Sequence, residues 1–390
     1  MHLHFSTAEF EQRKASVLSS MQAHELDALL MFKQESMYWL TGYDTFGFCF
    51  FQCLVLHSNG ILSLLTRKPD LRQALLTSVI KDVRVWKDAH QANPAVDLKL
   101  MLQDLGLENA TIGVEWDSHG LNAKNGKLVE SALHDFVRLK DASYLVSELR
   151  LIKSPIELDY VRRAGRTADL AMQDVFRLSV PGAWEGDIFA AMQGTVMRED
   201  GDDPANENIL SSGECALLGR YITGRRHIDP NDEVLAEIAG TYRHYHVAIM
   251  RTIRVGRVIE KQRDLWHLGV EALRNAQDAC LPGRPIGEIY QAYVRTISNS
   301  NYSFGRGLDY ALPFSIGYSL GATFAPTWMD YPLLYGDNPR LIEPNMVFFM
   351  HMTLRDDASG FSATPGETVI VTNSGVERLS TLDLDFRVNP

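Results

Sequence analysis

The residue whose chemistry stands out is Glu237, a lone carboxylate inside the apolar run VLAEIAG. Burying an ionised carboxylate is costly unless the group is paired or hydrogen-bonded. We therefore expect Glu237 either to act in function or to form a structural ion pair. Burial would raise its pKa, which suits a general base, and a sufficiently electrophilic substrate carbon would allow it to act as a nucleophile.

Two histidines accompany this carboxylate as candidate catalytic residues. His351 lies in VFFMHMTL, which is apolar enough for a central strand, where a lone histidine is either a hydrogen-bonded core residue or an acid–base group. His246 shares one face of an expected strand with Ala248 and Met250, because successive strand residues point to opposite faces. A structural hydrogen bond is the alternative role for His246.

Aromatic side chains are the candidates for the wall of a binding pocket. Trp328 lies in FAPTWMDYP, and Tyr43 and Phe46 lie in a second aromatic run. Such rings hold cationic or apolar parts of a substrate, although packing in a core is their commoner fate.

The carboxylate belongs to an element that reads as a β-hairpin. Residues 237–256, EIAGTYRHYHVAIMRTIRVG, alternate β-branched and aromatic residues with polar ones on both sides of a short turn at Arg243 and His244. This hairpin carries a carboxylate at Glu237 and an inert methyl group at Ala248. The chemical question is what function such a hairpin has.

The composition is that of a globular protein and excludes several partners. The chain has 390 residues, 45% hydrophobic and 22% charged, and its 49 acidic and 38 basic residues give a net charge of −11. This charge disfavours a nucleic-acid footprint and leaves no polybasic membrane patch. Four sparse cysteines favour a reducing cytoplasm, and no apolar run reaches the length of a signal peptide or a membrane span.

The chain divides into two predicted domains. Alternating helical and strand signals predict an α/β domain over residues 1–145, and a second domain over residues 146–390. A strong helix start follows the boundary, with Ser154 as N-cap, Pro155 at the first position and Glu157 completing a capping box.

The second domain contains an internal echo. PGAWEGDIFAAM at residues 181–192 resembles PGRPIGEIYQAY at residues 282–293, and strand-like text follows each copy. A duplicated half-domain explains the echo and predicts a helix, a helix and an antiparallel hairpin, occurring twice and sharing one sheet. Two unrelated helix starts that both use Pro-Gly are the alternative.

A set of phrases in a fixed order resembles the creatinase/prolidase/aminopeptidase P family. They are SMYWLTGYDTF, LRLIKSPIELDYVRRA, SSGECALLGR, the hairpin, SIGYSLG, EPNMVFFMHM and GETVIVTNSGVE. The resemblance covers nearly the entire chain. It implies an α+β "pita-bread" catalytic domain of two duplicated halves, preceded by a smaller α/β creatinase-type domain.

In the metallopeptidases of that family five side chains hold two metal ions, and the resemblance places five residues of this chain at those positions. They are Glu237, Ala248, Tyr318, His351 and Gly366. Only the first keeps a carboxylate, with Glu367 one residue beyond the last position. Because a two-metal site needs several anionic ligands, we expect no metal cofactor. A single metal ion on His246, His351 and Glu237 is the alternative.

This pattern of lost ligands resembles the metal-independent branch of the family, which contains creatinase and ectoine hydrolase. Arg220 stands where creatinase has a proton-carrying histidine, and a guanidinium suits a clamp on a substrate carboxylate. Tyr318 is expected to donate a hydrogen bond into the pocket. Glu367 is a weaker candidate, since strand parity turns it away.

The resemblance also implies a homodimer, in which Tyr43, Asp44 and Phe46 of the first domain complete the active site of the partner subunit. We expect a metal-independent hydrolase that opens an amide, amidine or guanidine-like C–N bond in a small zwitterion. Glu237, His351 and His246 would be catalytic. The alternatives are an Xaa-Pro peptidase with an atypical metal site, a lyase and a non-catalytic binding protein.

Overall fold

The computed structural model of the chain describes residues 3–220, 225–300, 315–356 and 360–390. It divides into two compact units, Met1–Arg150 and Leu151–Pro390. The first unit ends after helix α6 (Leu145–Arg150), which packs against other helices of that unit, whereas the sequence placed the boundary at residue 145. None of the helices in these ranges combines the length and apolar composition that crossing a membrane requires.

The first unit is a layered α/β domain, as predicted. Its six-stranded mixed sheet has the order β4-β3-β2-β1-β5-β6. The strands are β1 Ala28–Met31, β2 Cys53–His57, β3 Leu62–Arg67, β4 Asp82–Trp86, β5 Thr111–Val114 and β6 Arg138–Asp141. Two hydrophobic clusters lie on opposite faces of this sheet, because Leu29 belongs to one cluster and its neighbour Leu30 to the other.

Helices cover both faces of the first sheet. They are α1 Thr7–Ala23, α2 Gln34–Thr41, α3 Leu71–Thr77, α4 Pro94–Asp104, α5 Ala123–Leu133 and α6, with short 3-10 helices η1 Gly47–Cys49 and η2 Lys68–Asp70. Residues of α4 and α5 join one cluster, and residues of α1, α2 and α6 join the other.

The second unit begins with the predicted helix start. In helix α7 (Pro155–Leu178), the side chain of Ser154 accepts a hydrogen bond from the backbone N–H of Glu157, whose carboxylate accepts from the N–H of Ser154. The capping box is therefore confirmed. The other carboxylate oxygen of Glu157 accepts a hydrogen bond from the Tyr245 hydroxyl at 2.6 Å, which ties the start of the helix to the hairpin.

The large sheet of the second unit has the order β11-β10-β12-β15-β9-β8-β7 along its main path. The strands are β7 Ile209–Ser212, β8 Glu233–Tyr242, β9 Tyr245–Val255, β10 Gly317–Ser319, β11 Asp330–Leu333, β12 Val347–His351 and β15 Gly366–Val371, and off this path β16 Val376–Arg378 pairs with β15 and β17 Arg387–Asn389 pairs with β9. Strands β13 (Leu354–Asp356) and β14 (Phe361–Ala363) form a separate hairpin, and η3 (Gly213–Leu217) follows β7.

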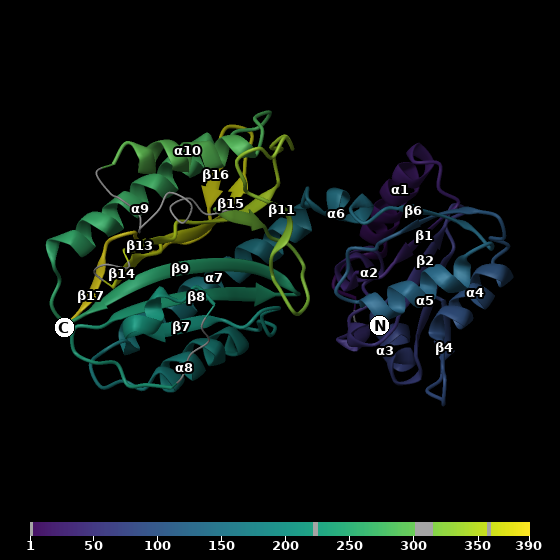
Figure 1. Cartoon of the computed structure of the whole chain (residues 1–390), viewed down its shortest axis with the longest axis horizontal. Helices are drawn as coiled ribbons and strands as arrows, with labels where there is room; N and C mark the ends of the chain where they lie inside the picture. Colours follow the sequence, from purple (N-terminus) through teal and green to yellow (C-terminus); the bar gives the residue numbers. More distant parts are fainter. Residues whose placement is uncertain (1–2, 221–224, 301–314, 357–359) are drawn as a thin grey trace. The chain divides into compact units, whose positions relative to one another are not determined.

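This strand order displays the duplication that the sequence echo predicts. Strands β7, β8 and β9 run in chain order from one side of the sheet to its middle, and β10, β12 and β15 do so from the other side. Each set follows two helices, α7 with α8 (Glu185–Arg198) and α9 (Glu260–Ala279) with α10 (Gly287–Ser298). The expected unit of two helices and antiparallel strands therefore occurs twice around one sheet (Figure 1).

The predicted hairpin is β8 and β9, the two longest strands, and its turn is strained. Arg243 and His244 have φ angles of +53° and +64°, a left-handed conformation that costs energy for residues other than glycine. The turn is held from outside. Asp202 accepts a hydrogen bond from the N–H of His244 at 2.8 Å, and the carbonyl oxygen of His244 accepts one from the N–H of Thr323 at 3.0 Å. The Phe324 ring stacks on the imidazole of His244.

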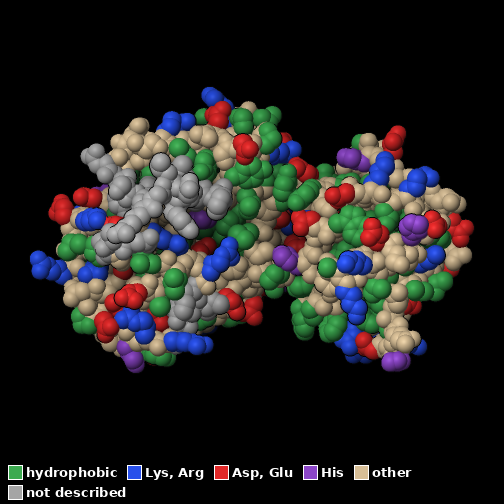
Figure 2. Space-filling view, viewed as in Figure 1, with side chains coloured by type: hydrophobic (Ala, Val, Ile, Leu, Met, Phe, Trp, Pro, Cys, Tyr) green, Lys and Arg blue, Asp and Glu red, His purple; other side chains and the backbone are tan. Residues whose placement is uncertain are grey.

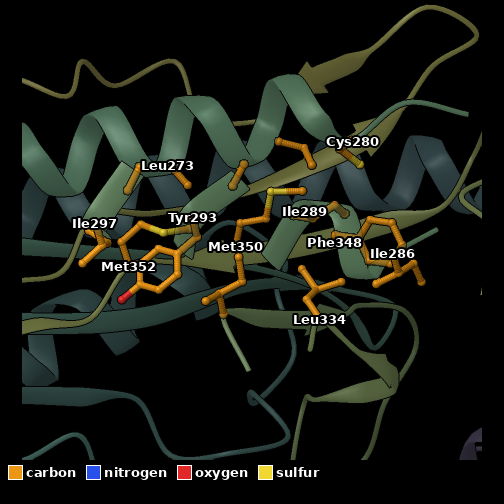
Figure 3. Close-up of a cluster of buried hydrophobic side chains, with 14 of the residues drawn as sticks. Leu273, Cys280, Ile286, Ile289, Tyr293, Ile297, Leu334, Phe348, Met350 and Met352 are labelled. Atoms are coloured by element: carbon orange, nitrogen blue, oxygen red, sulfur yellow. The ribbon is translucent and has the colours of Figure 1, made fainter. Parts of the chain in front are cut away.

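The helices of the second unit leave one face of the hairpin open. Helix α7 packs on β8 and β9 so closely that a Cβ atom at Gly240 would lie 2.2 Å from the carbonyl oxygen of Ala164. Gly240 therefore faces the helix, and by strand alternation Glu237 faces away from it. Helix α9 packs behind β12, where Phe348 and Met350 join a core with Leu273 and Tyr293 (Figure 3).

Charged side chains on the face shown in Figure 2 are interspersed by sign rather than gathered into one basic or acidic field. This distribution agrees with the absence of a phosphate-binding footprint in the composition.

Candidate active site

A cavity of about 310 Å³ lies within the second unit, and Glu237 lines it. Its wall is formed by residues of β7, β8, β10 and β12 and of the loops beside them. These residues are Asn206, Glu207, Ile209, Gly219, Arg220, Glu237, Tyr318, Pro326, Trp328, Met329 and His351. Five predicted site residues, Glu237, His351, Arg220, Tyr318 and Trp328, are thus brought together.

The sheet register places Glu237 and His351 in one row. Glu237 pairs with Met250, Met250 pairs with Gly366, and Gly366 pairs with His351. Side chains of residues that are directly opposite in a sheet lie on the same face. The carboxylate and the imidazole therefore face the same side, with a methionine and a glycine between them.

Gly366 has no room for a side chain. A Cβ atom there would lie 2.9 Å from Cβ of Met250 and 2.9 Å from Cζ of Phe349, closer than real Cβ atoms approach. The Phe349 ring, which is fully buried, fills the space above the glycine. A larger residue at this position would require the strands or the ring to move.

The carboxylate of Glu237 has one side-chain hydrogen bond within the described part of the chain. The hydroxyl of Tyr318 donates to its Oε1 at 3.3 Å. Burial raises the pKa of Glu237 to about 7, against the opposing effects of this hydrogen bond and of the Arg220 charge. The carboxylate is partly exposed, and it changes its charge near neutral pH.

Tyr318 is itself held by an aromatic neighbour. The indole N–H of Trp328 donates to the Tyr318 hydroxyl oxygen at 2.7 Å, and the two side chains are only 1% and 5% exposed. Burial, and next the nearby Glu237 charge, raise the pKa of Tyr318 well above its ordinary value. The phenol therefore keeps its proton and serves as a hydrogen-bond donor.

His351 is an uncharged imidazole in this setting. Burial lowers the pKa of His351 to about 4, so that the ring is neutral at physiological pH. Its ring lies 5.3 Å from the Phe349 ring and 5.9 Å from the Tyr318 ring, centroid to centroid. A neutral imidazole both donates and accepts hydrogen bonds, which suits contact with a substrate or exchange of a proton.

Arg220 supplies positive charge to the cavity from an exposed position. It has no ion-pair partner among the described residues, although residues 221–224, which follow it, lie outside them. Glu207, which is also exposed, lines the same cavity. Among the described residues, the cavity wall thus carries one cation and one carboxylate without an ion-pair partner, in addition to Glu237.

His246 does not line the cavity, which corrects the expectation of a catalytic role. The ring is fully buried, and its Nε2 accepts the N–H of Ala205 at 2.9 Å. Its Nδ1 lies 2.8 Å from the carbonyl oxygen of His244 and 3.0 Å from the hydroxyl of Thr323. Burial lowers the pKa of His246 to about 3, so this neutral ring joins two loops to the hairpin turn.

Glu367 lies on the opposite face of the sheet, which corrects its place as a substrate-binding candidate. The carboxylate is fully buried and contacts Arg251 at 3.1 Å, Arg378 at 2.9 Å and Arg274 at 3.5 Å. Burial alone would raise the pKa of Glu367, but the arginines outweigh it and hold that pKa below its ordinary value. Strand parity turned this residue away, as the sequence indicated.

Tyr43 and Phe46 belong to the first unit and have opposite surroundings. Tyr43 is fully buried, with its hydroxyl oxygen 3.3 Å from both Gln52 Oε1 and Thr66 Oγ1, so its ring is not available to a substrate. Phe46 is 81% exposed. The prediction for Tyr43 is therefore wrong, while Phe46 keeps the accessibility that its predicted role requires.

Several cavity residues were not predicted. Asn206, Glu207, Ile209, Gly219, Pro326 and Met329 complete the wall. Pro326 and Met329 flank Trp328 in the sequence, and Gly219 precedes Arg220, so adjacency to a candidate was the available signal. Asn206 and Glu207 come from a polar loop before β7 that carries no motif.

Two family models match the chain. One, described as metallopeptidase family M24, covers residues 159–373, and the other, described as the creatinase/prolidase N-terminal domain, covers residues 13–152. Ectoine hydrolase of Halomonas elongata is 26% identical over 97% of this chain and 96% of its own length. Xaa-Pro dipeptidase of Pyrococcus furiosus is 25% identical over 69% of this chain and 73% of its own length.

A solved structure has the same fold. The prolidase of Thermococcus sibiricus superposes with a TM-score of 0.85, covering 98% of this chain and all of that one (100%), at 19% sequence identity. The two-domain architecture with a pita-bread second domain, predicted from the sequence, is thereby confirmed.

The name of the first family model, metallopeptidase family M24, implies metal ions. The side chains of this site do not fit a two-metal centre. Among the five positions where the resemblance places the family's metal ligands, Ala248 and Gly366 have no donor atom, and Tyr318 is a protonated phenol. No group of three or more His, Cys, Asp or Glu side chains within the described ranges is placed to hold a metal ion. The alternative of one metal ion on Glu237, His246 and His351 also fails, because His246 is engaged elsewhere.

The pKa of Glu237 predicts how its replacement changes stability with pH. The unfolded chain releases this proton near 4.5 and the folded chain near 7, so the group destabilises the fold increasingly across this window and fully above it. Glu237→Gln removes that cost. Between pH 4.5 and 8, we expect the variant's unfolding free energy to rise relative to the parent by on the order of 1–3 kcal/mol.

Urea denaturation of both proteins at pH 5 and pH 8 measures this change. Glu233 also has a pKa raised by burial to about 7, but both proteins contain it, so its effect cancels in the difference. A stability difference that is the same at both pH values would show that Glu237 titrates as an ordinary surface carboxylate.

Proposed function

The chain belongs to metallopeptidase family M24 and is a hydrolase, and we propose that it opens a C–N bond in a small zwitterionic compound without a metal ion. The observation that carries this proposal is the row of residues across the sheet. Glu237 is the one carboxylate of that row, and Gly366, at the position of a ligand, has no space for a donor group. Hydrolysis at this site therefore depends on a protein base.

Glu237 is the proposed base. Its pKa of about 7 lets it hold or release a proton at working pH, which is the condition for efficient general acid–base catalysis. Water attacks the substrate carbon while the carboxylate of Glu237 takes one proton from that water molecule. The C–N bond then breaks as the leaving nitrogen receives that proton, so no oxidant or further reactant is needed.

The neighbours of Glu237 support this chemistry. Tyr318 and His351 are both uncharged at working pH, and while Tyr318 donates its hydrogen bond to Oε1 of Glu237, His351 offers a hydrogen bond to the group under attack. Because neither side chain carries a charge, the two do not over-stabilise the base as an ion. The buried indole of Trp328, with Met329, walls the cavity and limits the water that enters.

The zwitterionic substrate class follows from the charges around the cavity. Arg220 is exposed and without an ion-pair partner in the described ranges, so it suits a substrate carboxylate. Glu237 and the aromatic side chains suit the cationic end. A cavity of about 310 Å³ is of the size that small ligands occupy.

The relatives include both substrate classes. One is named an ectoine hydrolase and matches nearly the whole chain, and another is named an Xaa-Pro dipeptidase at a similar identity. The donor set at the ligand positions favours the first class over the second for this chain. A peptidase reaction would appear in the experiments below as turnover that depends on an added metal.

The Glu237→Gln variant tests the proposed base. The amide keeps the size of the side chain but cannot accept the proton, so turnover of a responsive C–N compound should fall by at least about a hundredfold. Glu271→Gln, the same change at an exposed position of α9, is the control and should keep the parent rate. A folded Glu237→Gln protein with parental turnover would exclude Glu237 as the base.

Metal content tests the second part of the proposal. We expect far less than one transition metal ion per chain after incubation with manganese, zinc or iron, because donor atoms are missing at Ala248 and Gly366 and Tyr318 keeps its proton. Elemental analysis of the desalted protein measures the content. Stoichiometric metal that chelators remove together with activity would overturn metal independence.

We also propose a cytoplasmic homodimer. The four cysteines are free thiols, as is usual in a reducing compartment, and Phe46 and Phe50 of the first unit are 81% and 44% exposed, which is typical of an interface. Light scattering at micromolar concentration should give twice the mass of the chain, and Phe46→Ser should weaken the association. A fully active monomer would contradict the dimer.

A further inference from the structure

The Tyr318 hydroxyl lies between two groups that together fix its direction. The indole Nε1 of Trp328 lies 2.7 Å from the hydroxyl oxygen, and Oε1 of Glu237 lies 3.3 Å from it. An indole N–H can only donate a hydrogen bond, so the phenol oxygen accepts it. The phenol proton is then directed to the carboxylate, which accepts hydrogen bonds when ionised.

We propose that Trp328 is a positioning residue for the reaction, acting through Tyr318 to set which oxygen of Glu237 takes the proton. Oε1 is occupied by the Tyr318 hydroxyl. Oε2 receives no hydrogen bond from any residue in the described ranges, and the carboxylate is partly exposed in the cavity. Oε2 is therefore the oxygen that faces water and substrate, and this last step rests on the proposed function.

The relay is built from rigid parts. Tyr318 belongs to β10, where it pairs with Phe349 of the neighbouring strand. Trp328 follows in the loop between β10 and β11. The start of this loop is bound to the hairpin turn, because the N–H of Thr323 donates to the carbonyl oxygen of His244. Near its end, the N–H of Met329 donates to Oγ1 of Thr327. Both side chains are almost fully buried, and a hydrogen-bond chain in such surroundings is stronger than one in water.

Other groups near the carboxylate act independently of the indole. Besides Glu237 and Tyr318, the charged or titratable side chains of the described residues that line this cavity are Arg220, Glu207 and His351. None of them has a hydrogen bond with Trp328 within the described residues, and the buried His246, whose ring centroid is 6.3 Å from that of Trp328, is bonded on both nitrogens. Removing the indole N–H should therefore alter Glu237 through Tyr318 alone.

A double-mutant cycle on the free protein tests this relay without a substrate. The protein is labelled with ¹³C at the glutamate side-chain carboxyl, and Glu237→Gln assigns the Glu237 resonance in a pH titration. Trp328→Phe keeps a ring but removes the donor, which weakens the bond from Tyr318 and should raise the Glu237 midpoint by about 0.5–1 pH unit. Tyr318→Phe should raise it at least as much.

The double variant is decisive because Trp328 is inferred to act only through Tyr318. We expect its midpoint to equal that of Tyr318→Phe. Trp266→Phe is the matched control, since it removes another buried indole bond, to the carbonyl oxygen of Leu384, and should leave the midpoint unchanged. The relay would be overturned if Trp328→Phe left the Glu237 midpoint unchanged. It would also be overturned if adding Trp328→Phe to the Tyr318→Phe variant raised that midpoint as much as it does in the parent protein.

A second measurement needs no change at Trp328, should that variant fold poorly. The indole N–H resonance of Trp328 in the parent protein should titrate with the Glu237 midpoint, and Tyr318→Phe should abolish this titration. An indole signal that ignores Glu237 would contradict the relay. The titrations test the hydrogen-bond chain, and the turnover of Glu237→Gln tests the proposed base. If the titrations agree with the chain while Glu237→Gln retains full turnover, only the proposed function is refuted, so failure of one proposal can be told from failure of the other.

Discussion

The ionisation of Glu237 among neutral side chains is the constraint on which the site depends. Burial destabilises this carboxylate as an ion, and among the described residues one neutral hydroxyl, that of Tyr318, and the guanidinium of Arg220 offset that cost. Additional cations would lower its pKa and make it a poor base, whereas a fully apolar surrounding would keep it protonated. The cavity wall holds the group between these extremes.

A second carboxylate of the same sheet shows the opposite outcome. Glu367, on the helix-covered face, is buried against three arginines and remains ionised, and it joins β15 to β9, β16 and α9. Glu237, on the open face, has a pKa near neutrality. The pKa values of these two glutamates of one sheet thus move in opposite directions, because the charges around them differ.

The sequence predicted the helices and strands, and the face of the sheet on which a side chain lies, better than it predicted contacts between side chains. Alternation along the second strand of the hairpin placed His246, Ala248 and Met250 on one face, and the capping box of Ser154 and Glu157 marked the start of α7. His246 has the predicted parity, but it lies beyond the cavity, where the N–H of Ala205 and the hydroxyl of Thr323 meet its ring. These partners come from loops, whose paths no periodicity reveals.

Steric relations between distant strands were also beyond the sequence. That Phe349 fills the space over Gly366, and that Trp328 reaches the hydroxyl of Tyr318, depends on how β12, β15 and a loop come together. Tyr43 was misplaced for a similar reason, because an aromatic run near a turn gave no sign that its ring is buried.

A catalytic carboxylate in place of a metal centre is the central claim, and the pH dependence of turnover in the presence of a strong chelator tests it most directly. We predict that a responsive C–N compound is turned over at an undiminished rate, and that the rate rises with a midpoint near pH 7 as Glu237 loses its proton. Activity that the chelator abolishes and a stoichiometric metal ion restores, with no dependence on a group titrating near neutrality, would contradict it.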